Sequence, residues 1–300
     1  MNRFISLFND EPTEDAAHDV DSEHTNYRHA NHTYTHVYVL TDTMHSDLTG
    51  KFPVTSRLGM QYIFVSVLDG YIHVEPMHTR HHLEYISAYK RTINFFWQLG
   101  RKSQFQRLDN ESCTALETFA RINGISIQYC APHQHRALKA ERAIRTFKNH
   151  FMSTLCTVAP EIPLDLWDHL LPQAELTSNH LLPCAVNTIV SAYAGLHEGP
   201  FDFTAHPIAP AGTKVVVHDK PSVRASWATH GTPGFYMGPA PKHYRCYRVW
   251  VTDTQTIRIT DTVAWYLHGL QLPGPTPPDI FLAALTDLTN VVNTLTTSPR

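Results

Sequence analysis

Residues 105–156 have the sequence FQRLDNESCTALETFARINGISIQYCAPHQHRALKAERAIRTFKNHFMSTLC, in which short β-rich runs alternate with helical periods. FQRLD and ISIQYC predict strands, and SCTALETFARI between them predicts a helix over 112–122 that ends at Asn123-Gly124. A long helix is predicted from about 138 to 156. Its apolar stripe consists of Ala140, Ile144, Phe147, Phe151 and Leu155. This order of strands and helices is typical of an α/β protein.

The flanking segments extend the pattern on both sides. Upstream, HVYVL, YIFVSVL and YIHVEP are β-rich runs, and HLEYISAYKRTINFFWQL predicts a helix over 82–99. We therefore expect a mixed sheet flanked by helices. Downstream, residues 163–195 have a helical pattern, whereas TKVVVH, GFYMG, YRCYRVWV and TIRITDTVAW predict a small all-β barrel or sandwich.

These changes in pattern divide the chain into four parts. We expect a flexible, acidic and His-rich arm over 1–34, and a core with a helical extension over 35–198. A small β-barrel-like domain is expected over 199–268. A Pro-rich linker and a tail helix, near 279–294, complete the chain over 269–300.

Composition limits the function classes. The five cysteines are scattered and never form C-x-x-C, which argues against a disulfide framework and against a cysteine-rich zinc site. No cysteine precedes Cys113, so the histidines of the N-terminal arm lack thiol partners and no zinc is expected. No run of about eighteen apolar residues and no signal-peptide pattern occurs. The sequence predicts an intracellular protein without a membrane partner.

Charge is distributed unevenly along the chain. Residues 1–46 hold eight acids against two arginines, and residues 151–199 hold five acids and no Lys or Arg. Residues 78–150 hold twelve Lys and Arg against five acids, an excess of seven. A polyanionic partner would therefore meet one segment of the chain rather than its whole surface.

Three carboxylates occupy positions that could serve metal-dependent phosphoryl chemistry. Asp47 follows the first β-rich run, Asp109 ends the predicted strand FQRLD, and Glu141 lies near the start of the long helix. Hard divalent cations prefer carboxylate oxygens, and two such ions can activate an attacking oxygen and stabilise a leaving one. Asp69 is an alternative first acid, but its VLDGY context is typical of a turn.

On the long helix, Glu141, Arg145 and Lys148 form a second stripe at positions i, i+4 and i+7. This stripe could align a metal-binding carboxylate with two cations that hold DNA phosphates. Taken alone, the helix pattern favours a solvated face with a Glu–Arg pair.

Beyond these patterns, the sequence resembles the integrase core of copia-type LTR retrotransposons, a branch of the ribonuclease H-like integrases. The matching stretches, in order over about 40–266, are HSDLTGKFPVTS, EPM, QRLDNES, APHQHR, AERAIRTFKNHF, LWDHLLPQAELT, FDFTAHPIAPAGTKVVVHDKP, GFYMGPAPKHYRCYRVWV and ITDTVAW. By position, Asp47, Asp109 and Glu141 match the D-D-E triad, and Arg145 and Lys148 match helix positions that face DNA.

The resemblance implies a ribonuclease H-like fold and a polynucleotidyl transferase within a Pol polyprotein. The implied cofactors are two Mg²⁺ or Mn²⁺ ions, and the implied reaction is 3′-end processing of element DNA followed by strand transfer into target DNA. The implied partners are DNA and further copies of the chain, with no small-molecule substrate, and the site of action is the nucleus. The chain departs from the family at Leu138, where relatives carry Asn, so a decayed copy that binds DNA without catalysis is an alternative. A host-adopted interaction module is another.

Several further residues are candidates for contact with DNA. Arg142 adjoins Glu141, and His133 and His135 lie in the loop before it; these histidines could instead be loop surface. Asn110 could orient Asp109 or serve a turn. In the β domain, bases alternate with aromatic residues in Lys242, His243, Tyr244, Arg245, Tyr247 and Arg248, a pattern that suits either a backbone-tracking surface or a half-buried strand.

Overall fold

The computed structural model describes residues 42–108, 114–129, 139–218 and 231–266, together with 284–286 and 289. The chain separates into two compact units, Met1–Trp265 and Tyr266–Arg300. The predicted arm and HVYVL strand therefore lie outside the described residues, as do the Pro-rich linker and most of the predicted tail helix.

The first sheet is a five-stranded mixed sheet with the order β3-β2-β1-β4-β5. Its strands are β1 (Thr43–Leu48), β2 (Tyr62–Leu68), β3 (Tyr71–Met77), β4 (Phe105–Leu108) and β5 (Ser126–Tyr129). β2 pairs antiparallel with β1 and β3, whereas β4 pairs parallel with β1 and β5. Four strands therefore run in one direction, and only β2 runs against them. This is the ribonuclease H-like arrangement, which confirms the predicted fold class.

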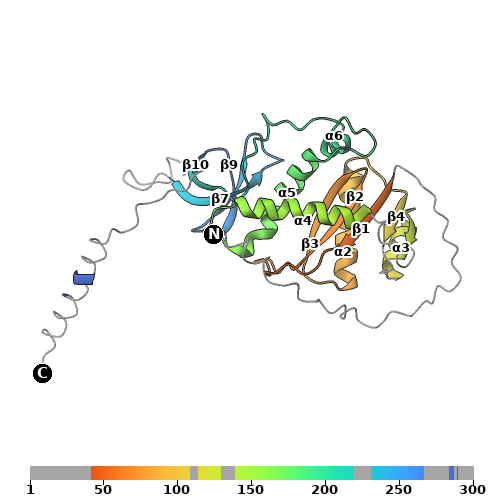
Figure 1. The fold of residues 1–300 in the computed structure, drawn as a ribbon, viewed down its shortest axis with the longest axis horizontal. Helices are drawn as coiled ribbons and strands as arrows, with labels where there is room; N and C mark the ends of the chain where they lie inside the picture. Colours follow the sequence, from red (N-terminus) through yellow and green to blue (C-terminus); the bar gives the residue numbers. More distant parts are fainter. Residues whose placement is uncertain are drawn as a thin grey trace, which may run out of the picture. The chain divides into compact units, whose positions relative to one another are not determined.

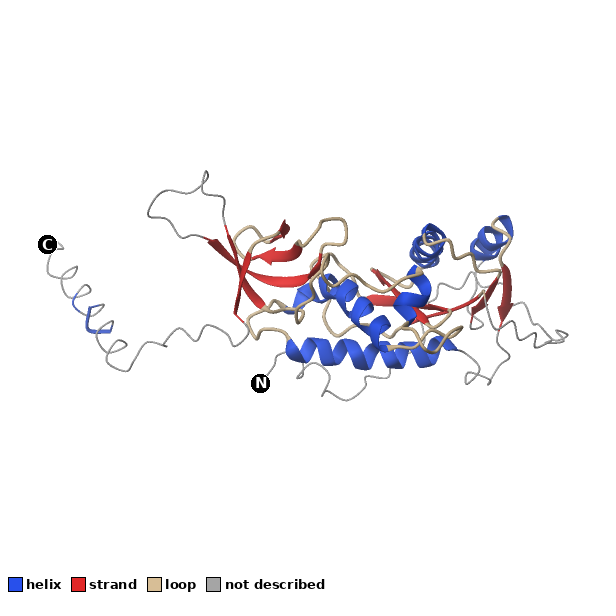
Figure 2. Cartoon of the chain, turned by 90° about the horizontal axis from the view of Figure 1, so that it is seen from above, coloured by secondary structure: helices blue, strands red, loops and turns tan. Residues whose placement is uncertain are grey.

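Helices cover both faces of this sheet (Figure 1). On one face, α2 (His82–Gln98) and α3 (Thr114–Ile122) share an apolar cluster with Met44, Phe64 and Leu68. On the other, α4 (Lys139–Thr157) and α5 (Trp167–Leu181) share a cluster with Val65 and Val67. Successive strand residues face opposite sides, so even and odd positions of β2 divide between the two clusters. The view from above shows the sheet between the helices (Figure 2).

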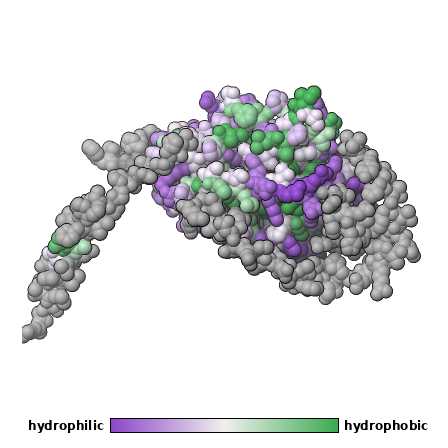
Figure 3. Space-filling model, in the orientation of Figure 1, coloured by the Kyte–Doolittle hydropathy of each residue, from purple (hydrophilic) through white to green (hydrophobic). Residues whose placement is uncertain are grey.

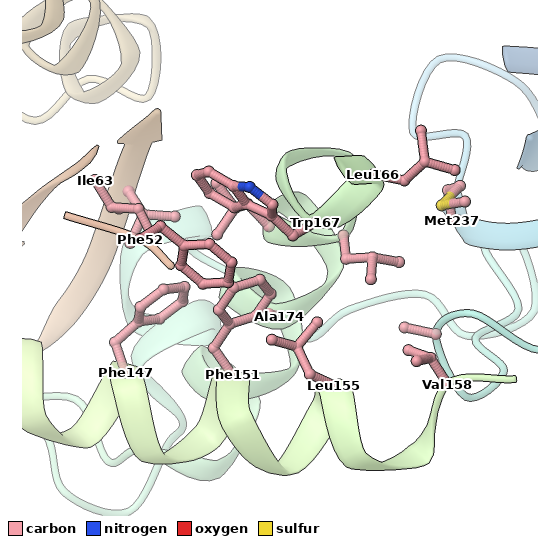
Figure 4. Close-up of a cluster of buried hydrophobic side chains, with 14 of the residues drawn as sticks. Phe52, Ile63, Phe147, Phe151, Leu155, Val158, Leu166, Trp167, Ala174 and Met237 are labelled. Carbon is pink, nitrogen blue, oxygen red and sulfur yellow. The ribbon is translucent and has the colours of Figure 1, made fainter. Parts of the chain in front are cut away.

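Aromatic packing joins α4 and α5 on their face of the sheet (Figure 4). The ring of Phe52 stacks on Trp167 with centroids 4.2 Å apart, and Phe147 stacks on Phe151 at 5.8 Å. The Trp167 indole donates a hydrogen bond to the Val54 carbonyl oxygen at 2.8 Å. Phe52 lies in the β1–β2 loop, so this cluster holds the end of β1 against both helices.

The second sheet, antiparallel over four neighbouring strands, follows two short elements, η2 (Leu164–Leu166) before α5 and α6 (Ala192–His197) after it. Its strands are β6 (Lys214–His218), β7 (Gly231–Pro239), β8 (Tyr247–Val251), β9 (Thr256–Thr260) and β10 (Val263–Tyr266), in the order β10-β6-β7-β8-β9. The small all-β region is therefore present as predicted. Its residues Phe235, Met237 and Trp250 belong to the same apolar cluster as α4 and α5.

Candidate active site at the edge of the first sheet

One edge of the first sheet collects the ends of four strands. Because β1, β3, β4 and β5 run in the same direction, their C-terminal ends meet at this edge. Asp47 is the penultimate residue of β1, and Asp109 follows Leu108, the last residue of β4, in the sequence. Glu141 lies in the first turn of α4.

Asp47 lies within β1, which corrects the expectation that it follows a strand. The segment TMHSDL is polar and has little strand propensity, but β1 is flanked by β2 and β4, and pairing on both sides fixes it as a strand. Asp47 pairs with Val65, which belongs to the apolar cluster of α4, so its side chain faces α4. The backbone N–H of Leu48 donates to Asp47 Oδ1 at 2.7 Å.

The predicted stripes of the long helix occur in α4. Ala140, Phe147, Phe151 and Leu155 are buried and Ile144 is half-buried. Glu141, Arg142, Arg145 and Lys148 are exposed, and Figure 3 shows hydrophilic side chains over the part of the molecule where α4 lies. A merely solvated face would be expected to contain a Glu–Arg pair. Within the described residues, Glu141 and Arg145 make no ion pair.

His45 shows how closely α4 approaches β1. Its side chain faces α4, as Asp47 does two residues further on, and only 3% of the residue is exposed. Burial, followed by the positive charges of Lys139, Arg107 and Arg142, lowers the pKa of His45 to about 3. The imidazole is therefore neutral at physiological pH. These charges come from β4 and from the first turn of α4, so both elements lie close to β1.

Cations near this edge differ from other arginines of the chain in whether they form ion pairs with carboxylates. Arg57, Arg91 and Arg101 form ion pairs with Asp165, Glu75 and Glu198, respectively. In the part of the chain that the structure describes, no ion pair involves Arg142, Arg145 or Lys148. Positive charge that no carboxylate neutralises is available to a polyanion.

Two carboxylates of the proposed triad suit a divalent cation. Asp47 and Glu141 supply carboxylate oxygens, the ligands such ions prefer, from two elements that pack together. Among residues 42–108, 114–129, 139–218 and 231–266, no three His, Cys, Asp or Glu side chains gather as a metal site. Asp109 lies outside these residues, as do Asn110, Glu111, His133 and His135.

The basic residues of the second sheet divide into two environments. Lys242, His243, Tyr244 and Arg245 are exposed in the turn between β7 and β8, with Tyr244 69% exposed. The backbone N–H of Arg245 donates to the Ala205 carbonyl oxygen at 2.7 Å. Tyr247 and Arg248 lie on β8 and are half-buried. The turn thus presents bases to solvent, whereas the strand residues are partly in the core.

A buried charged network on β3 has no counterpart in the sequence patterns. His73 Nδ1 lies 2.9 Å from Glu175 Oε1 of α5, and its Nε2 lies 3.1 Å from Glu75 Oε1. Arg91 Nε donates to Glu75 Oε2 at 2.7 Å. Burial disfavours the imidazolium, but Glu175 and Glu75 outweigh burial and raise the pKa of His73 to about 9. His73 and Glu175 are 102 residues apart, so no local pattern pairs them.

Comparisons with known proteins find matches among solved structures only. No family model and no curated protein matches it. The simian T-cell lymphotropic virus intasome in complex with PP2A regulatory subunit B56 gamma matches with a TM-score of 0.42 and 17% identity, over 74% of this chain and 77% of that one.

Two catalytic core domains also match. That of BIV integrase has a TM-score of 0.40 and 15% identity, over 53% of this chain and 95% of that one. That of HTLV-2 integrase in complex with magnesium, in a trimeric form, has a TM-score of 0.38 and 19% identity, over 53% and 98%. At these scores, the fold assignment rests on the strand order and directions described above.

No described helix is long and apolar enough to cross a membrane.

Proposed function

We propose that this chain is a DDE-type polynucleotidyl transferase, the integrase of a copia-type LTR retrotransposon. The observation that carries the proposal is the approach of the first turn of α4, which carries Glu141, to β1, which carries Asp47 and pairs with β4. The ordered motif matches over about 40–266 support the same family.

In this proposal each group has a defined role. Asp47, Asp109 and Glu141 hold two Mg²⁺ or Mn²⁺ ions, which, when bound, supply Lewis-acid stabilisation of the attacking and leaving oxygens. Arg142, Arg145 and Lys148 hold DNA phosphates along the exposed stripe of α4. The attacking groups are water and then the 3′-hydroxyl of the element DNA, so no protein nucleophile is required.

We also propose the binding partners and the cellular location of the chain. We expect the chain to act on DNA as a homo-oligomer, in the nucleus at the time of integration. The exposed Lys242 and Arg245 in the β7–β8 turn are further candidates for phosphate contact.

The test is strand transfer by the purified chain on a labelled element end. We expect D47N, D109N and E141Q to reduce product at least about a hundredfold, because each removes an anionic ligand. E161Q is the matched control, since Glu161 instead pairs with Lys214 of β6. Activity that persists in E141Q or D109N would contradict the assignment.

DNA binding without catalysis is the second candidate function, favoured by cations on α4 that have no carboxylate partner within the described residues. These cations could bind DNA phosphates even if the triad were inactive. A wild-type chain that binds DNA equally with and without Mg²⁺ and yields no product would establish this alternative, and robust turnover would exclude it.

A further inference from the structure

A second group of cations lies on the β3 side of the same edge. The loop of residues 78–81 follows β3 and leads into α2, and it carries Arg80. Arg80 Nη2 donates to the carbonyl oxygen of Thr49 at 2.9 Å. Thr49 follows the last residue of β1 and is two residues from Asp47. Arg80 is thereby tied to the end of the strand that carries the first acid of the proposed triad.

Arg80 is also held from a second side. Its guanidinium carbon lies 5.1 Å from the centre of the Tyr62 ring, at the start of β2. Such stacking fixes the plane of the guanidinium and leaves most of its five N–H donors directed elsewhere. Arg80 is exposed, and it pairs with no carboxylate in the described part of the chain. Glu84, the acid in the first turn of α2, instead lies 3.4 Å from His78.

Lys51 is a second exposed cation in the loop after β1. It lies three residues beyond β1, between Thr49 and the buried Phe52. Phe52 is anchored by its stack on Trp167 and by its N–H, which donates to the Gln61 carbonyl oxygen at 2.6 Å. The lysine side chain is exposed and makes no ion pair or hydrogen bond with any described residue. Lys51 therefore follows Thr49, which accepts a hydrogen bond from Arg80, by two residues, and its ammonium pairs with no acid in the described part of the chain.

The cations near this edge come from separate elements of the chain. Tyr62, which supports Arg80, packs with the α2 and α3 cluster, whereas Arg142, Arg145 and Lys148 belong to α4 on the other face. Two groups of cations from separate elements near the C-terminal end of β1 suit a nucleic-acid backbone that extends across this edge.

We propose that Arg80 and Lys51 bind phosphodiester groups of DNA on the β3 side of Asp47. This inference rests on the proposed function, because the edge must be a DNA site. A planar guanidinium held on two sides offers paired N–H donors to phosphate oxygens with little ordering cost, and a lysine adds a point charge. The phosphodiesters come either from the element end or from the target duplex, which share this chemistry.

The experiment measures DNA affinity of the full chain without divalent metal, from about 50 to 200 mM salt. We expect R80Q and K51Q each to weaken binding and to reduce the slope of log affinity against log salt by about one, because each removes one phosphate contact. K102Q is the matched control. Lys102 is an exposed cation 5.8 Å from the Trp97 ring, and it precedes β4 at the opposite edge of the sheet.

Separate 3′-end processing and strand-transfer assays distinguish the two sources of phosphate. A loss in both assays assigns the contact to the element end, and a loss confined to strand transfer assigns it to the target; either outcome supports the proposal. Because R80Q also removes the bond to Thr49, K51Q provides an independent arm, and R80K, which retains the charge, should restore most of the salt slope. If the wild type binds DNA, and R80Q and K51Q both bind it with the same affinity and the same salt slope, this inference is wrong but the proposed function is not. Failure of the wild type to bind DNA would instead overturn the proposed function.

Discussion

His73 is a buried imidazole with a carboxylate at each ring nitrogen and the Phe95 ring stacked 4.0 Å away. Its pKa is raised to about 9 from an ordinary value of 6.5. The stabilisation that this shift represents is therefore fully present below pH 6.5 and is lost as pH rises through about 9. Loss of the imidazolium would leave Glu175 buried without its cationic partner.

We predict that the His73 imidazole titrates near pH 9 in the folded protein, as followed by NMR of the ring protons. E175Q should move this titration toward 6.5, because Glu175 supplies the largest effect that opposes burial. E75Q should lower the pKa of His73 less, because Glu75 contributes less. A wild-type His73 with a pKa at or below its ordinary value would contradict the charged network.

Gly70 occupies a tight turn in which both backbone conformation and space favour glycine. It follows Asp69 in the β2–β3 turn, and both residues have positive φ, 90° and 52° respectively. These angles are typical of a type I′ turn, as the Asp-Gly pair suggests. A Cβ at Gly70 would lie 2.9 Å from the backbone nitrogen of Ala185, so the turn also requires glycine for space.

We expect G70A to lower the free energy of unfolding by about 2–4 kcal/mol, through backbone strain and overpacking together. G124A is the control, because Gly124 also has a positive φ, 70°, but a Cβ added there would meet no other atom within 4 Å. It should cost only about 1 kcal/mol. Urea unfolding measures both, and equal losses would show that the Ala185 contact is unimportant.

At the scale of elements, side chains of α5 hydrogen-bond to the backbone of β3, where a sixth strand would otherwise pair. β3 is an edge strand, and Asn179 of α5 satisfies its backbone in both directions. Asn179 Oδ1 accepts from the Ile72 N–H at 2.8 Å, and its Nδ2 donates to the Ile72 carbonyl oxygen at 2.7 Å. Glu175 Oε2 accepts from the Val74 N–H at 3.0 Å. Side chains of one helix thereby satisfy backbone groups of the outer strand β3 that could otherwise pair with a strand of another chain.

We predict that N179A destabilises the fold by about 2–4 kcal/mol, because it leaves two buried backbone groups of Ile72 unsatisfied. The amide of Ile72 should then exchange with solvent faster than those of β2. N149A serves as control, since Asn149 is an exposed residue of α4, and it should cost less than about 0.5 kcal/mol. Unchanged exchange at Ile72 in N179A would contradict this account of the edge.

The elements differ in how far the sequence predicts them. The helix over 82–99 corresponds to α2 (His82–Gln98), and the helix over 138–156 corresponds to α4 (Lys139–Thr157), because their apolar residues recur at helical spacing. No pattern predicts β1, since TMHSDL owes its strand form to neighbours on both sides rather than to propensity. For the same reason the sequence places Asp47 after a strand rather than within one. Arg80 and the His73 network depend on contacts between distant segments, which no periodicity encodes.

At the scale of the whole unit Met1–Trp265, the two sheets share one apolar cluster. Met237 of β7 is fully buried and lies near Leu166, the residue before α5 (Figure 4), and Val158, which follows α4, belongs to the same cluster. A Cβ on Gly212 would lie 2.5 Å from Val158, so the segment before β6 also packs tightly there. Separating the sheets would expose this shared surface, and we therefore expect them to unfold together.

We predict that M237A lowers the free energy of unfolding by about 2–5 kcal/mol, through lost burial and an incompletely filled cavity. The loss should reach the first sheet, so the amide of Val65 on β2 should exchange faster although Val65 is not on the mutated sheet. M152A is the matched control, because Met152 on α4 is 38% exposed, and it should change stability far less. If M237A accelerated exchange only in β6 to β10, the second sheet would be an independently folding domain, and the shared cluster would be a docking surface rather than a common core.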